Sequence, residues 1–203
     1  MRARWAALTA MAILLLCLLG LLTAGSSSAT QQFFEVHVIS GSFSGAASVY
    51  ATDVDGDGDT DVLGAAFTGD EIAWWENSGG APPSFTRHAI TDTLDRARGV
   101  YATDVDGDGD TDVLGAAGHP SNRIVWWENE PSGVPANPVS WTAHVLSDSF
   151  EGAHSVYAAD LDGDDDVDVL GSAAGNHLTS YVGRISWWEN SGGTPPTLSL
   201  IHI

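Results

Sequence analysis

The chain has 203 residues, of which 27 are acidic and seven are basic, and its formal net charge is −20 at neutral pH. This excess of negative charge argues against nucleic acids and anionic membrane surfaces as partners, because both repel a polyanion. The only cysteine is Cys17, so the rest of the chain cannot close its loops with disulfide bonds.

The N-terminal segment, residues 1–29, is predicted to be a cleaved secretory signal peptide. Arg2 and Arg4 precede an apolar run at residues 11–22, and the small residues Ser27 and Ala29 suit signal cleavage. The apolar run is short for a membrane span, which needs about 20 residues. Cleavage leaves five arginines against 27 acidic residues, a formal charge of −22. We therefore expect a secreted or cell-surface protein with no membrane anchor after cleavage, in which metal ions replace disulfides as links.

The remainder, residues 30–203, repeats one unit three times. The unit contains an acidic loop, written DVDGDGDTD at 53–61 and 104–112 and DLDGDDDVD at 160–168. A tryptophan strand of the form IxWWEN follows each loop, at 72–77, 124–129 and 185–190. A phrase with a central histidine precedes each loop, at 33–40, 85–91 and 141–147, and LSLIHI at 198–203 resembles it. We place the repeats at about 33–84, 85–140 and 141–197, with the start of a fourth at 198–203.

Each unit contains four short apolar or β-branched segments separated by turn residues, a pattern typical of β-strands. In the first unit the expected strands are 48–54, 62–67, 72–76 and 84–90. Four strands in about 50 residues, repeated, favour the blade of a β-propeller. We therefore expect an all-β protein with about three four-stranded antiparallel blades, which form an incomplete propeller.

The repeats resemble the FG-GAP (VCBS-type) repeats of secreted proteins, a blade family also found in integrin α-subunit propellers. The resemblance covers residues 33–203 and rests on two motifs that occur three times in order, SVYATDVDGDGDTDVLGAA and IxWWEN. It implies a β-propeller fold and places each acidic loop between the first two strands of a blade. Such blades occur in adhesins, lectin-like domains and enzyme appendages, so the resemblance does not define one role.

The acidic loops have the pattern D-x-D-x-D-G-x-x-D, in which alternate oxygen ligands converge on one calcium ion. Carboxylates at positions 1, 3, 5 and 9 and the backbone carbonyl at position 7 are the expected ligands. Gly64 stands where an EF-hand needs a bidentate glutamate, so an EF-hand is not expected. The predicted ligands for up to three Ca²⁺ ions are Asp53, Asp55, Asp57, Asp59 and Asp61; Asp104, Asp106, Asp108, Asp110 and Asp112; and Asp160, Asp162, Asp164, Asp166 and Asp168.

The third loop departs from this pattern, because Asp165 replaces the turn glycine found at Gly58 and Gly109. Glycine accepts a left-handed backbone conformation that a side chain resists. We therefore expect the third calcium site to be the weakest.

The aromatic residues and histidines outside the loops have structural and functional interpretations. Adjacent strand residues point to opposite faces, so the tryptophan pairs are predicted to pack between blades, with sugar stacking as the alternative. The recurrent histidines are predicted to be structural, whereas the other three leave a metal or ligand role open. The recurrent ones are His37, His88, His144 and His202, and the others are His119, His154 and His177.

No nucleophile elbow, phosphate-binding loop or zinc-hydrolase motif occurs in the sequence, so we expect no enzyme activity. The expected function is a secreted calcium-binding propeller module for extracellular recognition, adhesion or structural display, with an unidentified protein or glycan as partner. The alternatives are an accessory propeller of a larger secreted hydrolase or lyase, and a carbohydrate-binding lectin that uses the variable loop 175–183. Propellers typically have four to eight blades, so three blades have three explanations: the chain is a piece of a longer protein, several copies associate to complete the ring, or the segment 198–203 pairs across chains.

Overall fold

The computed structural model describes residues 35–130, 139–174, 182–193, 196 and 198–201. The predicted signal peptide, most of the loop 175–183, and His177 and His202 lie outside these residues. The chain divides into two units, Met1–His37 and Val38–Ile203, and all strands belong to the second. Among the described residues there is no helix long and apolar enough to cross a lipid bilayer.

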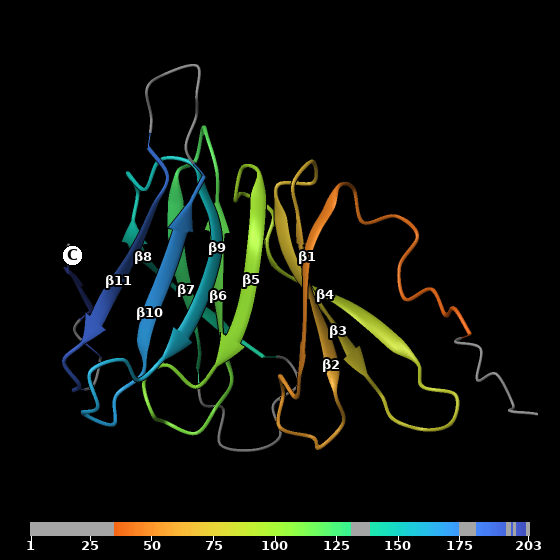
Figure 1. Cartoon of the computed structure of the whole chain (residues 1–203). Helices are drawn as coiled ribbons and strands as arrows, with labels where there is room; N and C mark the ends of the chain where they lie inside the picture. The colour runs from red at the N-terminus through yellow and green to blue at the C-terminus, as the bar shows by residue number, and fades with distance from the viewer. Residues whose placement is uncertain (1–34, 131–138, 175–181, 194–195, 197, 202–203) are drawn as a thin grey trace, which may run out of the picture. The chain divides into compact units, whose positions relative to one another are not determined.

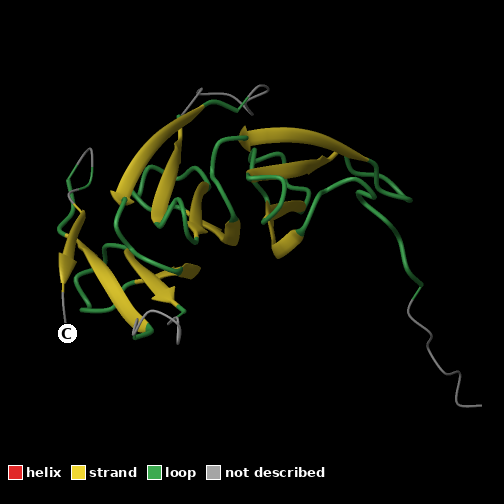
Figure 2. Ribbon diagram, turned by 90° about the horizontal axis from the view of Figure 1, so that it is seen from above, coloured by secondary structure: helices red, strands yellow, loops and turns green. Residues whose placement is uncertain are grey.

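The second unit contains three four-stranded antiparallel sheets, which confirms the predicted all-β fold of propeller-type blades (Figure 1). The regular structure drawn in Figure 2 consists of strands alone. Blade 1 comprises β1 (Ala46–Thr52), β2 (Asp61–Ala66), β3 (Glu71–Asn77) and β4 (Phe85–Thr91); blade 2 comprises β5 (Ala97–Thr103), β6 (Asp112–Ala117), β7 (Arg123–Asn129) and β8 (Trp141–Ser147); blade 3 comprises β9 (Ala153–Ala159), β10 (Asp168–Ala173), β11 (Arg184–Asn190) and β12 (Leu198–Ile201). In each blade the strands follow one another in chain order, as expected for a meander.

Each blade begins one strand later than the repeat that the sequence suggested. The predicted repeats start at the histidine phrases, whereas the blades start at the strand that follows each phrase. The histidine phrases at 85–91 and 141–147 are β4 and β8, and they close blades 1 and 2 by pairing with the tryptophan strands. Leu198–Ile201 pairs with β11 in the same way, so the prediction that 198–203 begins a fourth blade is wrong for these residues. The physical reason is the turn after the first and third tryptophan strands, where glycines with positive φ, Gly79 and Gly80 in blade 1 and Gly192 and Gly193 in blade 3, return the chain alongside that strand.

The N-terminal histidine phrase behaves differently from the other copies. Its described part, residues 35–40, forms no strand, and Val36 and Val38 are exposed. No tryptophan strand precedes this phrase among the described residues, so its backbone has no equivalent of β3, β7 or β11 to pair with.

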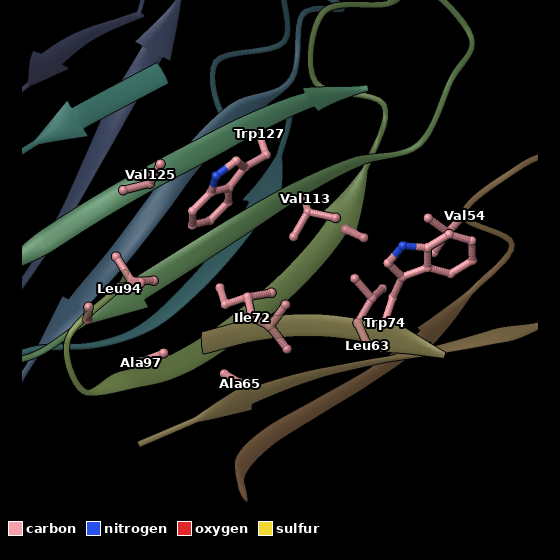
Figure 3. Close-up of a cluster of buried hydrophobic side chains, with 13 residues drawn as sticks. Val54, Leu63, Ala65, Ile72, Trp74, Leu94, Ala97, Val113, Val125 and Trp127 are labelled. Atoms are coloured by element: carbon pink, nitrogen blue, oxygen red, sulfur yellow. The ribbon is translucent and has the colours of Figure 1, made fainter. Parts of the chain in front are cut away.

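The hydrophobic core lies between neighbouring blades rather than inside any one of them. Figure 3 shows the first cluster, in which Ile72 and Trp74 of blade 1 meet Val113 and Trp127 of blade 2. The second cluster joins blades 2 and 3 in the same way, around Trp126 and Trp188. Neighbouring tryptophans thus serve opposite faces, and the predicted packing between blades is confirmed for Trp74, Trp126, Trp127 and Trp188. Trp75 is also buried, against Phe43, and Trp187 is partly exposed. The five buried rings are therefore not available for sugar stacking.

Candidate metal loops

Each acidic loop connects the first two strands of its blade. The last paired residues before the loop are Thr52 and Asp61 in blade 1, Thr103 and Asp112 in blade 2, and Ala159 and Asp168 in blade 3. The intervening residues form no ladder, because alternating aspartates and glycines favour turns over strands. The placement implied by the family resemblance is therefore confirmed.

The first aspartate of each loop folds the loop around itself. In blade 1 the two carboxylate oxygens of Asp53 accept hydrogen bonds from the backbone amides of Gly56, at 2.8 Å, and Gly58, at 2.9 Å. Asp104 binds Gly107 and Gly109 at nearly the same distances in blade 2. These bonds give the loop its curled shape without a metal, and each carboxylate oxygen keeps a lone pair that can bind a cation.

The curled loops bring aspartate oxygens together in three groups. In each group three carboxylates offer oxygens that lie within 4.8 Å of one another. The groups are Asp53, Asp55 and Asp57; Asp104, Asp106 and Asp108; and Asp160, Asp162 and Asp168. The predicted ligands at positions 1, 3 and 5 therefore converge in blades 1 and 2, whereas Asp164 at position 5 is not in the third group.

The aspartate at the seventh position of each loop was expected to bind calcium through its backbone carbonyl. Its side chain lies outside the oxygen group of its loop. A Cβ atom added to Gly79 would lie 2.5 Å from a carboxylate oxygen of Asp59, and one added to Gly192 would lie 2.6 Å from Asp166. The carboxylates of Asp59 and Asp166 therefore lie against the glycine turn that follows the tryptophan strand, and they are not in the oxygen groups. Asp110 likewise lies outside its group.

The ninth aspartate has a structural role that sequence reasoning missed. Asp112 is fully buried, and its carboxylate accepts hydrogen bonds from the amides of Val105, at 2.9 Å, and Asn129, at 2.8 Å. Asp61 and Asp168 make the equivalent pair of bonds in blades 1 and 3. This carboxylate therefore ties the start of its loop to the end of the tryptophan strand. The available signal was the asparagine that ends every IxWWEN phrase.

The electrostatics of the loops favour cation binding. Burial raises the pKa of Asp61 to about 6 and that of Asp112 to about 7, against the effect of their backbone hydrogen bonds. Burial also raises the pKa of Asp55 and Asp106, and neighbouring carboxylates raise both further. A nearby divalent cation would reverse this repulsion and stabilise the charged forms. The oxygen groups can therefore accommodate a metal ion.

The third loop shows the expected effect of its missing glycine. Asp165 adopts a φ of 72°, where Gly58 and Gly109 have 94° and 99°. Its amide lies 3.3 Å from the Asp160 carboxylate, compared with 2.9 Å for the glycine amides in the other loops. A side chain in this region of φ carries strain, so the first aspartate holds this loop more loosely.

The histidines divide as the sequence suggested, with one exception. His88 donates a 2.7 Å hydrogen bond from Nε2 to the Glu76 carboxylate and stacks on Trp74, and His144 does the same with Glu128 and Trp126. The structural prediction is thereby confirmed for His88 and His144. His37 is exposed and belongs to the other unit, and its one ion-pair partner among the described residues is Glu35, so no packing role of the predicted kind is found for it there. His119 and His154 are exposed and belong to none of the metal-ligand groups of the described residues.

Comparison with known families matches an FG-GAP-like repeat to residues 53–115 and again to residues 104–171. Together these matches span more than half of the chain. The chain belongs to the FG-GAP-like repeat family. Each match starts at the first aspartate of an acidic loop and ends in the second strand of the next blade, so each match covers two consecutive loops. Repeats of this family are generally non-catalytic. No curated protein matches the chain.

Proposed function

We propose that this chain is a secreted, calcium-stabilised FG-GAP propeller module that serves extracellular recognition or structural display rather than catalysis. The observation that carries the calcium assignment is the convergence of three aspartate carboxylates in each acidic loop, with oxygens within 4.8 Å of one another. The signal-like N-terminus supports secretion, and the family supports a binding or structural role.

Calcium is the metal that suits these donors best. All predicted ligands are oxygens from carboxylates and backbone carbonyls, which favours hard cations over zinc or copper. The loops are short connections between two strands, and calcium tolerates six to eight ligands in irregular geometry. Magnesium demands a near-ideal octahedron and retains its own water molecules.

Calcium binding is tested by isothermal titration and by thermal unfolding of the chain without residues 1–29, in calcium and in a chelator. Binding only to the folded state stabilises it by about 2.7 kcal/mol per site when free calcium is 100 times the dissociation constant. For a protein of this size, that raises the melting temperature by roughly 5–10 °C per site. Identical melting temperatures in calcium and chelator would exclude calcium as a stabilising ligand.

A loop variant and a matched control make this test specific. Asp108→Asn removes one charge from the second oxygen group, whereas Asp92→Asn removes one from an exposed aspartate outside the loops. The first is expected to lose one strong calcium site, and the second is expected to bind like the unmodified chain. Equal losses in both variants would indicate general electrostatic attraction rather than a site.

Secretion is tested separately, by expressing the full chain in a secreting host and measuring the mass of the exported protein. A mass that corresponds to cleavage after Ala29 supports the proposal, and retention of residues 1–29 in the exported protein contradicts it.

A further inference from the structure

Each blade presents two different apolar faces to its neighbours. In each blade, the A face is the face of the sheet formed by the residues equivalent to Leu63, Ile72 and Trp74 of blade 1. The B face is the opposite face of the same sheet. In both described interfaces an A face packs on the B face of the following blade. The A face of blade 1 meets the B face of blade 2, and the A face of blade 2 meets the B face of blade 3. Two faces therefore have no partner blade among the described residues, the B face of blade 1 and the A face of blade 3. On the first of them Phe43 covers Trp75, with ring centroids 4.9 Å apart, and leaves the rest of the face without a partner.

The open A face carries residues of the kind that are buried in the two formed interfaces. Ile72 and Ile124 are fully buried, but Ile185, at the same position of blade 3, is 79% exposed. Leu170 and Trp187 of blade 3 are more exposed than their buried equivalents in blades 1 and 2. An exposed isoleucine within a patch of this composition is characteristic of an interaction surface.

The open B face of blade 1 likewise exposes apolar residues whose equivalents are buried in the other two blades. Val100 and Val156 are buried in the interfaces of blades 2 and 3, whereas Val49 at the same position of blade 1 is 71% exposed. Ala46 is exposed as well, although its equivalents Ala97 and Ala153 are fully buried. The two open faces are thus the two halves of an interface that this chain already forms twice.

The asparagine side chain that ends each tryptophan strand also lacks its inter-blade hydrogen bond at the open B face of blade 1. The side-chain amide of Asn129 donates to the carbonyl of Val54 in the preceding blade, at 3.2 Å, and Asn190 donates to Val105 at 3.1 Å. The equivalent Asn77 donates only to Thr60 within its own blade. The residue whose carbonyl would complete the set is Leu161, which is 46% exposed, whereas Val54 and Val105 are buried.

A row of tyrosines continues across the same seams. Tyr50 and Tyr101 have ring centroids 4.7 Å apart, and Tyr101 and Tyr157 have centroids 4.5 Å apart. Tyr157, at the open end of the row, is 53% exposed. Its missing neighbour corresponds to a tyrosine at the position of Tyr50.

We propose that the occupant of both open faces is a second copy of this chain. The A face of blade 3 packs on the B face of blade 1 of the partner copy, and the twofold-related contact forms at the other end. This is a heterologous contact that closes into a ring when it is made twice. The three described blades of two copies together give a six-bladed propeller, within the usual range of four to eight.

The inference is tested by analytical ultracentrifugation of the chain without residues 1–29, in calcium and at a salt concentration that screens its negative charge. The expected result is a species with twice the mass of one chain. A monomer at micromolar concentration overturns the proposal, and a series of larger open polymers shows that the contact does not close.

Two charge-inserting variants probe one face each. Ile185→Asp alters the A face of blade 3, and Val49→Asp alters the B face of blade 1; both side chains are exposed within one chain, so the blades are expected to remain folded. Each variant is expected to weaken dimerisation at least tenfold while the far-ultraviolet circular dichroism spectrum, which reports the strands, stays unchanged. Val145→Asp is the control, because Val145 is 54% exposed on the outer strand of blade 2, away from both open faces.

A mixture of the two variants identifies the type of contact. Ile185→Asp retains an intact B face and Val49→Asp retains an intact A face, so a mixed pair can form one of the two contacts. Tagged Ile185→Asp chain is therefore expected to capture Val49→Asp chain but not itself. Dimerisation that responds to only one of the substitutions refutes the A-to-B contact.

The outcome is separable from the calcium proposal. A dimer that forms without any measurable calcium binding supports this inference and contradicts the proposed metal function. Calcium binding by a strictly monomeric chain does the reverse.

Discussion

Replacing Asp112 by alanine is expected to destabilise the chain even in the absence of calcium. The Asp112 carboxylate is the only hydrogen-bond acceptor described for the buried amides of Val105 and Asn129. An amide left buried without an acceptor costs about 1–3 kcal/mol. The variant is therefore expected to lose roughly 2–6 kcal/mol, a large fraction of the 5–15 kcal/mol that stabilises a typical domain.

The assay is urea unfolding in a chelator, monitored by the fluorescence of the interface tryptophans. A loss of this size shifts the midpoint by on the order of 1 M, since the dependence of stability on urea is about 1–3 kcal/mol per molar. Asp108→Asn is the matched comparison, because its carboxylate is exposed and the asparagine oxygen can still accept from the Asp110 amide. It is expected to match the unmodified chain in chelator and to differ only in calcium. If Asp112→Ala unfolds at the unmodified midpoint in chelator, the ninth aspartate has no structural role and acts solely as a ligand.

Three further substitutions test other parts of the architecture. Gly115→Ala places a Cβ atom 2.6 Å from the Ile72 side chain, so overpacking between blades 1 and 2 is expected to cost about 1–3 kcal/mol in urea unfolding; an unchanged midpoint would show that this seam is loosely packed. Asp165→Gly relieves a left-handed side chain worth about 1 kcal/mol and is expected to tighten the third calcium site roughly fivefold by titration, whereas a weaker site would contradict the strain argument. Asn190→Ala removes the buried bonds to Val105 and Val167 and is expected to lower stability by about 1–3 kcal/mol, and no loss would mean that the amide does not hold blades 2 and 3 together.

The strands were predictable because their signals are local. Alternating β-branched and aromatic residues bounded by glycine, proline and aspartate defined every strand of the first unit to within two residues. The boundaries of the repeats were not predictable in the same way, because a repeating pattern has no marked origin. A repeat that starts at the histidine phrase and one that starts at Ala46 contain the same elements in the same cyclic order. The pairings of β4 with β3, β8 with β7 and β12 with β11 show which boundaries the hydrogen bonds follow.

The metal loops show a similar division. Converging carboxylates could be predicted from the spacing of Asp53, Asp55 and Asp57, since three alternate side chains on a tight turn meet locally. The role of Asp112 was not visible, because its second partner, the Asn129 amide, lies 17 positions away on another strand. For Asp164 the spacing predicted a ligand that the structure does not place in the oxygen group of its loop. This is the loop that has Asp165 in place of the turn glycine.

The loops and the seams between blades share residues, which links the two proposals in structural terms. Asp112 binds the backbone amide of Asn129, the side chain of Asn129 donates to the carbonyl of Val54 in the preceding blade, and the amide of Val54 donates to Asp61. The hydrogen bonds thus continue from the loop of blade 2 to the loop of blade 1. An ion that orders one loop therefore also orders the asparagine that reaches the next blade. In a repeat array, stability depends on the contacts between neighbours as well as on each unit, so this shared asparagine is where the proposed metal binding would strengthen stacking.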